Sequence, residues 1–380
     1  MILHLASDEK FIDDAINLFE TINPGQNKFI IGVGLESDGL KYIKNQDKVQ
    51  IGTYGSKQYK KLIGNISSYD AVIVHFLDRY KAEVIISAPE SVKFVWMIWG
   101  GDAYKLIAYN VYDDNTSDVL KKTEQENWFK EIFRKLFLVK SLILCRRKFK
   151  SKKLYAAIKR FRYCTTVIPN EYQLFTKSLP LKSSYIPFNY SGIDFSILNT
   201  FKKNANSFNN IIVGNSGSPT NNHITIFRKL GNGKSGLRKV IVPLNYGQKA
   251  YIEEVIKVGT NILKDTFSPL TEFIPFPEYV KILSSCSVCI MNHYRQQGMG
   301  NIIMILWFGA KLYLRKENPV FQYLTENKIK VFSLNDEELT FDNLTEEEKV
   351  NNRLIIEKLY DPKLIEKKAI NLVRLLTTVN

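Results

Sequence analysis

The sequence contains no apolar stretch long enough to cross a lipid bilayer. Hydrophobic residues make up 45% of its 380 residues, but polar residues interrupt every run well before the ~20 residues that a membrane-spanning helix needs. The first ten residues, MILHLASDEK, also lack a basic region ahead of an apolar one. We therefore expect no secretory signal peptide, and we interpret these residues as the first strand of a domain.

Cysteine is scarce, and the four cysteines show no paired spacing of the kind that disulfide frameworks have. This usage favours a reducing cytoplasm. Cys286 and Cys289 form a C-x-x-C, but the surrounding CSVCIM is typical of a buried strand and no second pair of ligands lies nearby. We interpret the two thiols as structural, with a metal or redox role as the alternative.

Acidic residues are absent between Glu131 and Glu171, where twelve Lys or Arg are interleaved with Leu, Ile, Phe and Tyr. The chain has 53 Lys and Arg against 38 Asp and Glu, a formal net charge of +15, which favours an anionic partner. The apolar interleaving predicts that residues 131–163 form an amphipathic segment lying on an anionic membrane. Its predicted docking residues are Arg146, Arg147, Lys148, Lys150, Lys152 and Lys153.

The length of the chain exceeds what one core usually supports, so two domains are expected. Short apolar runs alternate with helical patterns in both halves, as in KFIIGVG, DAVIVHF and, later, NIIVGNSG and KVIVPLNYG. This alternation predicts two doubly wound, Rossmann-like α/β domains with parallel sheets, facing across a cleft. We place them at residues 1–195 and 205–360, joined by a polar linker at 190–209. A helix at 361–380 can pack back on the first domain.

The stretch RQQGMGN leads from a predicted strand into a buried helix. Its glycines let the backbone approach a ligand, and the start of the helix presents free N–H groups and a positive dipole end to an anion. A diphosphate fits such a loop, and the alternative is a set of polar residues that only cap the helix. The residues concerned are Arg295, Gln296, Gln297, Gly298, Gly300 and Asn301.

The next loop, RKEN, should lie beside it in a doubly wound fold. Glu317 could accept hydrogen bonds from ribose hydroxyls there, or it could be a solvated turn residue. Asn318 can cap the following helix, because Pro319 sits at its first position.

Several motifs together resemble one known family. VGNSG…NNHI, VIVPLNYG…AYIEEV…G, RQQGMGN and RKENPVFQYLTE resemble, in order and spacing, the bacterial glycosyltransferases of family 56. These are the 4-acetamido-4,6-dideoxygalactose (Fuc4NAc) transferases of enterobacterial common antigen assembly, also called 4-alpha-L-fucosyltransferases. In the first half, WMIWGGDAY and VHF resemble the family's tryptophan–glycine–aspartate stretch and its histidine strand.

The resemblance implies a GT-B fold, a thymidine-diphosphate (TDP) sugar as donor and a lipid-diphosphate-linked saccharide as acceptor. It also implies work at the cytoplasmic face of the inner membrane, with no required metal and no cofactor, since the nucleotide sugar is a substrate. The basic insert at 131–163 is longer and more charged than the family pattern, which leaves the identity of the acceptor open.

With this resemblance, the turn Gly214, Asn215 and Ser216 is expected to face the donor, although it could be an ordinary turn. His223 could donate a hydrogen bond to the departing diphosphate, with capping or packing as the alternative. Asp102 and His75 are the two candidates for the base that deprotonates the acceptor hydroxyl. Asp102 could instead be a helix N-cap, and His75 a structural residue.

We therefore predict a metal-independent glycosyltransferase of the hexosyltransferase type, bound peripherally to the membrane. It would move a deoxyamino or 6-deoxy sugar to a lipid-linked saccharide in bacterial surface glycan assembly. One alternative is a basic nucleic-acid-binding protein, although no nucleic-acid module is recognisable and we expect no nucleic acid as partner. The other is a non-catalytic sugar-nucleotide binder.

Overall fold

The computed structural model describes residues 1–35, 39–107, 109–122, 152–190, 192–202, 209–231, 236–335 and 338–378. The chain forms two compact units. Unit 1 comprises Met1–Tyr109, Leu138–Ile193 and Tyr360–Asn380, and unit 2 comprises Asn110–Phe137 and Asp194–Leu359. Each unit is built around its own parallel sheet, which confirms the predicted α/β class.

Unit 1 contains a seven-stranded sheet in the order β3-β2-β1-β4-β5-β6-β7, with every neighbouring pair parallel. The strands are β1 (Ile2–Ser7), β2 (Asn27–Val33), β3 (Val49–Thr53), β4 (Ala71–His75), β5 (Phe94–Met97), β6 (Phe161–Thr165) and β7 (Ser184–Tyr185). Along β1, Leu3 and Leu5 belong to one buried cluster and Ile2 and Ala6 to another. The sheet is therefore covered on both faces, as continuous apolar strands require.

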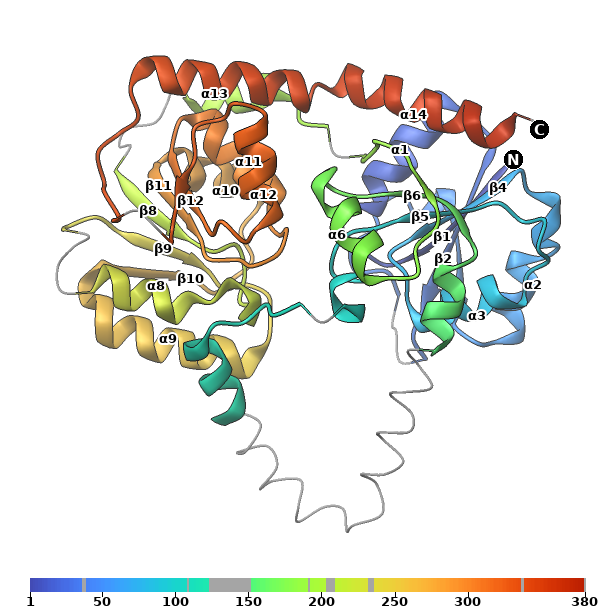
Figure 1. Ribbon diagram of the computed structural model, residues 1–380, viewed down its shortest axis with the longest axis horizontal. Helices are drawn as coiled ribbons and strands as arrows, with labels where there is room; N and C mark the ends of the chain where they lie inside the picture. Colours follow the sequence, from blue (N-terminus) through green and yellow to red (C-terminus); the bar gives the residue numbers. More distant parts are fainter. Residues whose placement is uncertain are drawn as a thin grey trace, which may run out of the picture. The chain divides into compact units, whose positions relative to one another are not determined.

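The helices of unit 1 are α1 (Ile12–Ile22), α2 (Lys57–Ile63), α3 (Arg79–Ser87), α6 (Asn170–Ser178) and α14 (Pro362–Thr377). The last helix, α14, packs against α1 at the opposite end of the sequence (Figure 1). Ile365, Ala369 and Leu372 of α14 lie in the same buried cluster as Ile12 and Ile16 of α1. The end of the chain thus completes the core of unit 1.

Unit 2 contains a six-stranded sheet in the order β10-β9-β8-β11-β12-β13. Its strands are β8 (Asn210–Val213), β9 (Val240–Pro243), β10 (Phe267–Leu270), β11 (Cys286–Met291), β12 (Lys311–Leu314) and β13 (Phe332–Ser333), paired in parallel. From β8 the chain builds outward to one side, and from β11 to the other. In this class of fold, ligands bind outside the carboxyl ends of the two central strands at such a reversal. We call this place in unit 2, at the carboxyl ends of β8 and β11, the crevice.

The helices of unit 2 are α7 (Phe195–Lys202), α8 (His223–Leu230), α9 (Lys249–Leu263), α10 (Phe276–Ser284), α11 (Met299–Phe308), α12 (Pro319–Glu326) and α13 (Glu346–Leu359). Figure 1 shows α8 and α9 on one side of the sheet and α10, α11 and α12 on the other. Almost every residue of α11 is buried, and the helix packs against both α10 and α13. The sequence MGNIIMILWF gives a helix with apolar side chains on nearly all sides, and such a helix is stable where it is buried on all sides.

Two parts of the chain differ from the predicted organisation. The segment 110–122 belongs to unit 2, whereas we assigned it to the first domain, and Val119 lies in the buried cluster of unit 2. The predicted polar linker at 190–209 contains α7, in which Leu198 is buried and Phe195 stacks on Trp307. Apolar residues at helical spacing within this polar stretch explain the difference.

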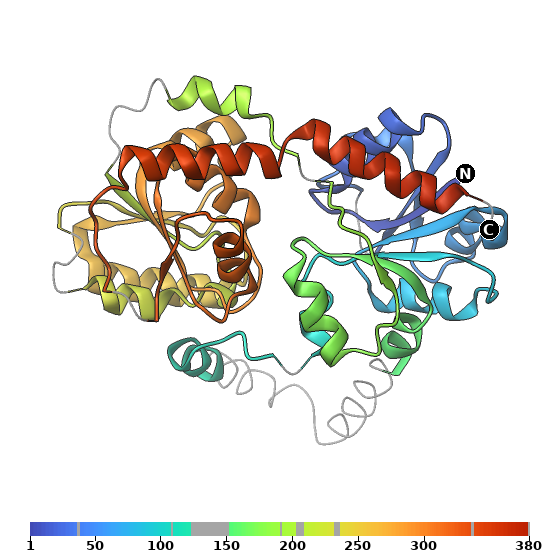
Figure 2. The same ribbon diagram turned by 45° about the horizontal axis from the view of Figure 1, so that its top comes forward.

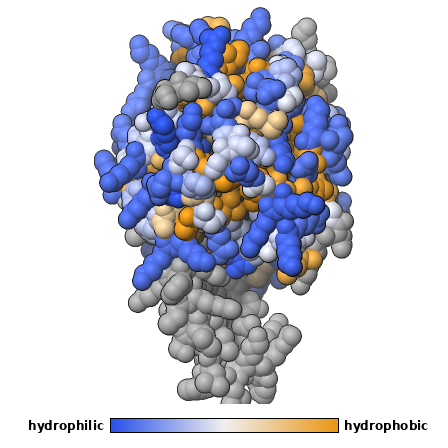
Figure 3. Space-filling model, turned by 90° about the vertical axis from the view of Figure 1, so that its right-hand side faces the viewer, coloured by the Kyte–Doolittle hydropathy of each residue, from blue (hydrophilic) through white to orange (hydrophobic). Residues whose placement is uncertain are grey.

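The described cysteines are buried and free, and none forms a disulfide. Burial raises the pKa of the Cys286 thiol to about 12, so it stays protonated at neutral pH. The described residues also include no helix that is long and apolar enough to cross a membrane. The face of the molecule drawn in Figure 3 is mainly hydrophilic, with hydrophobic residues showing between the polar ones, which is ordinary for a folded surface.

Candidate functional site

Two loops meet at the crevice between β8 and β11 in unit 2, and the side chain of Gln297 joins them. Its amide nitrogen donates to Oδ1 of Asn215 at 2.9 Å, and its Oε1 accepts from the hydroxyl of Thr220 at 2.6 Å. Asn215 and Thr220 belong to the loop after β8, and Gln297 to the loop after β11. The residues predicted from GNSG and RQQGMGN are thereby brought together.

Asn221 organises the loop after β8 and is completely buried. Its Oδ1 accepts the backbone N–H of Asn215 at 2.9 Å and lies 2.7 Å from Nε2 of His293. Its Nδ2 donates to the hydroxyl of Ser216 and to the carbonyl of Ser218. Because every polar atom of this amide is engaged, the turn is held in one shape before a ligand arrives.

Two glycines allow the close packing in this crevice. Gly214 has φ of +70°, and a Cβ there would lie 2.7 Å from both Oδ1 of Asn221 and Nε2 of His223. Gly298 has φ of +68°, and a Cβ there would lie 3.0 Å from Cγ of Asn215. Both positions therefore require glycine. A Cβ at Gly300 would meet nothing within 4 Å, so packing within the protein does not explain that glycine.

Two helices begin at this crevice without a side-chain cap. The N-cap residues are Asn222 for α8 and Gly298 for α11, both in the left-handed conformation, and neither gives a capping hydrogen bond. The first N–H groups of an uncapped helix have no intrahelical partner and favour an anion, as does the positive end of the helix dipole. In α8 the first of these groups, the N–H of His223, donates to the hydroxyl of Tyr251. This pair of helix starts is the strongest candidate for a ligand-binding feature in unit 2.

His223 opens α8 and is fully buried. Its backbone N–H donates to the hydroxyl of Tyr251 at 3.2 Å, and its Nδ1 lies 3.3 Å from the same oxygen. Its Nε2 has no hydrogen-bond partner among the described residues and faces the Gly214 turn. Burial lowers the pKa of His223 to about 3, so the ring is neutral at physiological pH and offers one polar nitrogen to the crevice.

The side chains of the other predicted donor-binding residues contact different parts of unit 2. Arg295 donates from Nη1 to the carbonyl of Gln296 at 3.0 Å, and Gln296 is almost fully buried. Asn301 is turned towards α10, where its Nδ2 donates to the hydroxyl of Tyr279 at 2.7 Å. Glu317 is held by Nδ2 of Asn335 at 3.0 Å.

Asn318 caps α12, as its sequence position indicated, because its Oδ1 accepts the N–H of Val320 at 2.9 Å. The same side chain donates to the carbonyls of His293 and Arg295, each at 3.0 Å. It therefore fixes the loop after β11 from behind. Since Asn318 is completely buried, its described contacts are structural.

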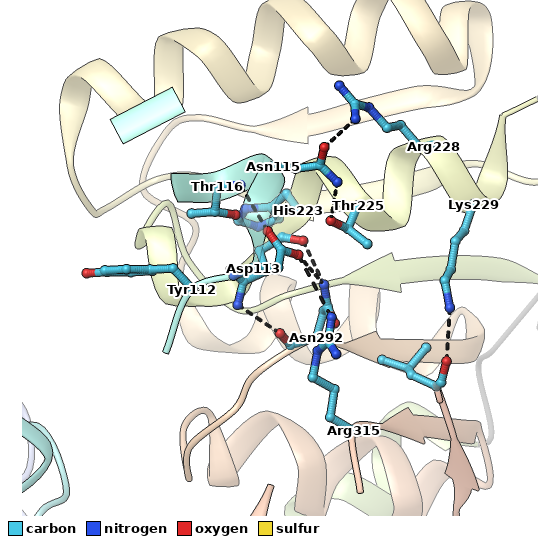
Figure 4. A network of polar contacts seen from close by, with 12 residues as sticks. Tyr112, Asp113, Asn115, Thr116, His223, Thr225, Arg228, Lys229, Asn292 and Arg315 are labelled. Carbon is cyan, nitrogen blue, oxygen red and sulfur yellow. Dashed lines mark hydrogen bonds and ion pairs between the residues drawn. The ribbon is translucent and has the colours of Figure 1, made fainter. Parts of the chain in front are cut away.

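A polar network that the sequence analysis missed borders the crevice (Figure 4). Arg315, directly after β12, donates from Nε to Oδ1 of Asn292 at 2.6 Å, and Nδ2 of Asn292 lies 3.3 Å from Oδ2 of Asp113. Asp113 also accepts the N–H of Thr116 at 2.9 Å, and its own N–H donates to Oδ1 of Asn222 at 3.0 Å. These contacts anchor the YDDN stretch around Asp113 to unit 2.

Asp102 lies in unit 1 and is 3% exposed. Its Oδ2 accepts from the N–H of Leu77 at 2.9 Å and from Nε1 of Trp96 at 2.8 Å, and its Oδ1 accepts from the N–H of Trp99 at 3.1 Å. These bonds tie the chain after β4 to the chain after β5, so the carboxylate braces two loops. None of the three donors belongs to a helix that starts at Asp102, so the N-cap alternative does not describe its contacts.

Burial raises the pKa of Asp102, and the N–H donors partly offset that rise. His75, at the end of β4, is also fully buried, and burial lowers its pKa well below the usual value. Its Nε2 lies 3.1 Å from Nδ1 of His4, whereas its own Nδ1 has no hydrogen-bond partner among the described residues. Of the two candidates for the base, only His75 therefore keeps an uncommitted polar atom.

Four of the predicted membrane-docking residues, Arg146, Arg147, Lys148 and Lys150, lie outside the described residues. Lys152 is exposed, and Lys153 pairs with Glu83 at 2.9 Å. In the part of the chain that the structure describes, no three His, Cys, Asp or Glu residues are close enough together to hold a metal ion.

The comparison with protein families can now be set beside this geometry. The model of 4-alpha-L-fucosyltransferase glycosyl transferase group 56 matches residues 170–356, a range that contains both loops of the crevice. Residues 170–356 belong to glycosyltransferase group 56. The match confirms the family resemblance drawn from the sequence motifs, and it identifies the chain as a glycosyltransferase.

Solved structures extend the comparison to the whole chain. Sucrose-phosphate synthase from Thermosynechococcus elongatus is similar at a TM-score of 0.64 with 9% identity, covering 99% of both chains. HepE from Anabaena, in complex with UDP and glucose, is similar at 0.59 with 11% identity, covering 99% of this chain and 100% of its own. An alpha,alpha-trehalose-phosphate synthase (UDP-forming) from Burkholderia vietnamiensis is similar at 0.59 with 8% identity, covering 100% of both chains. At such identities the likeness concerns the fold, and it confirms the GT-B prediction.

Proposed function

We propose that this glycosyltransferase moves a deoxyamino or 6-deoxy sugar from a nucleoside diphosphate to a lipid-linked saccharide in bacterial surface glycan assembly. The observation that carries the donor half of this proposal is the pair of uncapped helix starts, α8 and α11, at the crevice of unit 2. They offer partially positive N–H groups to a diphosphate. The group 56 resemblance supports TDP as the carrier, and the HepE complex with UDP makes uridine the alternative base.

The leaving diphosphate carries charge that the site must stabilise during transfer. We propose that the helix starts, Arg295 and the polar Nε2 of His223 do this without a metal ion. The two helix dipoles and the fixed Gln297 bridge are in place before the donor binds, so little reorganisation is needed. The acceptor would bind on unit 1, and the basic segment at 131–163 would hold the enzyme peripherally at the cytoplasmic face of the inner membrane.

Nucleotide binding tests the donor half directly. TDP or UDP should raise the melting temperature, because ligand at 100 times Kd stabilises the folded state by about 2.7 kcal/mol. Replacing Gly298 by Val should weaken binding by roughly tenfold or more, since a β-branched residue resists the left-handed conformation and its Cβ would push against Asn215. Gly34→Ala is the control, because a Cβ at Gly34 meets nothing within 4 Å.

Two outcomes would contradict the proposal. If neither TDP nor UDP shifts the melting temperature of the wild-type protein, the donor site is wrong. If EDTA abolishes sugar transfer and Mn²⁺ or Mg²⁺ restores it, the metal-independent mechanism is wrong. Nucleotide binding without transfer to any lipid-linked saccharide would favour the non-catalytic binder instead.

A further inference from the structure

A chain of three side chains in unit 1, joined by polar contacts, ends at the one uncommitted nitrogen of His75. Asn27 on β2, His4 on β1 and His75 on β4 lie side by side in the sheet, since β1 pairs with both other strands. Oδ1 of Asn27 lies 3.3 Å from Nε2 of His4, and Nδ1 of His4 lies 3.1 Å from Nε2 of His75. Both rings are completely buried.

The orientation of the Asn27 amide is fixed by what surrounds its nitrogen. Nδ2 donates to the carbonyl of Phe19 at 3.1 Å, to Oε1 of Glu20 at 3.0 Å and to the carbonyl of Asn23 at 2.7 Å. All three partners are acceptors, so the opposite orientation would place oxygen against oxygen. The atom that faces His4 is therefore the oxygen, which only accepts, and Nε2 of His4 must carry a proton.

The protons on both imidazoles follow from this. His4 is neutral, because burial lowers its pKa to about 3, and a neutral ring carries one proton. With that proton on Nε2, Nδ1 of His4 is an acceptor and Nε2 of His75 must be the donor. The proton of neutral His75 is then on Nε2, and Nδ1 keeps a bare lone pair.

The backbone around this nitrogen is held under strain. Phe76, the residue after His75, has φ of +58°, a conformation that bulky residues rarely adopt and that clusters at functional sites. The buried Nζ of Lys81 holds it by donating to the Phe76 carbonyl at 3.0 Å, and Asp102 holds the following N–H of Leu77. The His75 ring is thus fixed in position as well as in its tautomer.

The surroundings of His75 Nδ1 indicate the class of ligand. The ring centroid of His75 lies 6.5 Å from that of Trp99 and 5.7 Å from that of Tyr190, while Phe11, half exposed, packs edge-on against Trp99 with their centroids 5.8 Å apart. A bare lone pair repels phosphate and accepts from a hydroxyl, and aromatic rings pack against the C–H face of a sugar. Asp102 already accepts from three N–H donors, whereas Nδ1 of His75 has no hydrogen-bond partner among the described residues.

We infer that the relay Asn27–His4–His75 fixes Nδ1 of His75 as the hydrogen-bond acceptor for a hydroxyl of the acceptor saccharide. Asn27 and His4 are then positioning residues that act through His75. This inference rests on the proposed function for the identity of its ligand, and on the hydrogen-bond geometry for the tautomer.

The tautomer is tested by ¹⁵N correlation spectra of the imidazole rings, recorded without ligand. The chain has four histidines, so single substitutions assign every signal. We expect His4 and His75 to carry their protons on Nε2. Asn27→Asp keeps an acceptor facing His4 and should keep this tautomer, whereas Asn27→Ala removes it and should give a mixture at His75.

Both variants lose the same three donor contacts at the end of α1, so a purely structural Asn27 predicts the same spectrum for both. A wild-type spectrum with the His75 proton on Nδ1 overturns the relay, and so do two variants that behave alike. The wild-type spectrum decides the question even if neither variant folds.

The ligand is tested by kinetics with a short-chain lipid-diphosphate-linked disaccharide as acceptor. His75→Phe should raise the acceptor KM by about tenfold, the effect of one lost hydrogen bond. His75→Asn, which can place an amide oxygen where Nδ1 was, should have an acceptor KM close to that of the wild type. The Kd for nucleotide should stay unchanged in both His75 variants. An unchanged acceptor KM in His75→Phe overturns the inference and leaves the proposed function standing. Absence of nucleotide binding by the wild type overturns the proposed function and the ligand identity that rests on it, but not the tautomer of His75, because the spectra are recorded without nucleotide.

Discussion

All four histidines of this protein are completely buried: His4 and His75 in unit 1, and His223 and His293 in unit 2. Burial lowers the pKa of His4, His223 and His293 to about 3 and that of His75 well below its ordinary value. The folded protein therefore keeps neutral rings, whereas the unfolded chain takes up protons near pH 6.5. A residue type that usually senses pH is here committed to one protonation state.

This commitment predicts acid sensitivity. Between pH 6.5 and about 3 the unfolded state binds more protons, so the free energy of unfolding falls as the pH falls, by about 1.4 kcal/mol per pH unit for each ring. Urea unfolding at pH 7 and pH 5 measures the change. His223→Gln should reduce the change of unfolding free energy with pH by the contribution of one histidine ring. Stability that stays flat between these two pH values would contradict the prediction.

Among the described residues, three carboxyl groups change the pH dependence of the unfolding free energy in the opposite direction to the histidines. Burial raises the pKa of Glu9, Asp14 and Asp102, so these groups bind protons more readily in the folded state, and acid favours folding through them. Their contribution to the slope of unfolding free energy against pH lies between the ordinary carboxyl pKa and the raised pKa of the folded state. Comparison of wild type with His223→Gln isolates the histidine contribution, because the carboxyl groups are the same in both proteins.

The residues of the crevice show what sequence alone can provide. Gly214, Gln297 and Gly298 stand in short motifs between a strand and a helix, so their meeting follows from the fold class. Asn292 and Asp113 carry no such signal, because they meet at 3.3 Å although the chain between them is long. That contact forms because the 110–122 segment belongs to unit 2. The polar residues of this segment do not indicate which unit it joins.

At the scale of elements, one face of α14 packs into a core whose other residues lie far away in the sequence. Leu372 is completely buried, while Leu375 on the same helix is 43% exposed. Lys93 adds a polar tie by donating to the carbonyl of Leu376 at 3.0 Å. The helix is thus an integral part of unit 1, although the sequence separates it from the rest of that unit.

A matched pair of substitutions tests this role. Leu372→Ala should lower the stability of unit 1 by about 2–5 kcal/mol, the usual effect of a cavity at a buried leucine. Leu375→Ala should change it by less than about 0.5 kcal/mol, because that side chain already faces solvent. Denaturant unfolding monitored in unit 1 distinguishes them, and equal effects of the two variants would exclude the packing of α14 as described.

Helix patterns were the most predictable level of structure. The apolar stretch after RQQGMGN gave α11, and Asn318 with Pro319 gave the start of α12, because both signals are local. The helix α7 was missed because its surroundings are polar, although it carries apolar residues at helical spacing. The packing of Phe195 on Trp307 and the burial of Leu198 show why it forms.

At the scale of the molecule, the formal charge of +15 predicts binding to anionic membranes. Each basic residue near such a surface contributes about 1 kcal/mol, screened within about 8 Å at physiological salt. Replacing Arg146, Arg147, Lys148, Lys150, Lys152 and Lys153 by Gln should release the protein from anionic liposomes. Nucleotide binding should be retained, since the donor site that we propose lies in unit 2.

A control of equal charge separates a local docking segment from general attraction. Six of the exposed lysines elsewhere on the described surface can form this control: Lys57, Lys60, Lys61, Lys249, Lys257 and Lys281. Their replacement by Gln should leave most liposome binding intact. Sedimentation with anionic and neutral vesicles measures both variants, and equal loss in the two would rule out a dedicated membrane segment.

The return of α14 to unit 1 also has a consequence for how the protein is made. The ribosome delivers the strands of unit 1 first, then unit 2, and α14 last. Until α14 is synthesised, the apolar cluster around Ile12, Ile16 and Phe19 lacks the helix that covers it, whereas unit 2 is already complete at Leu359. Completion of unit 1 therefore waits for synthesis of α14, and a chain that stops before Pro362 leaves this part of the core exposed for chaperones and proteases to recognise.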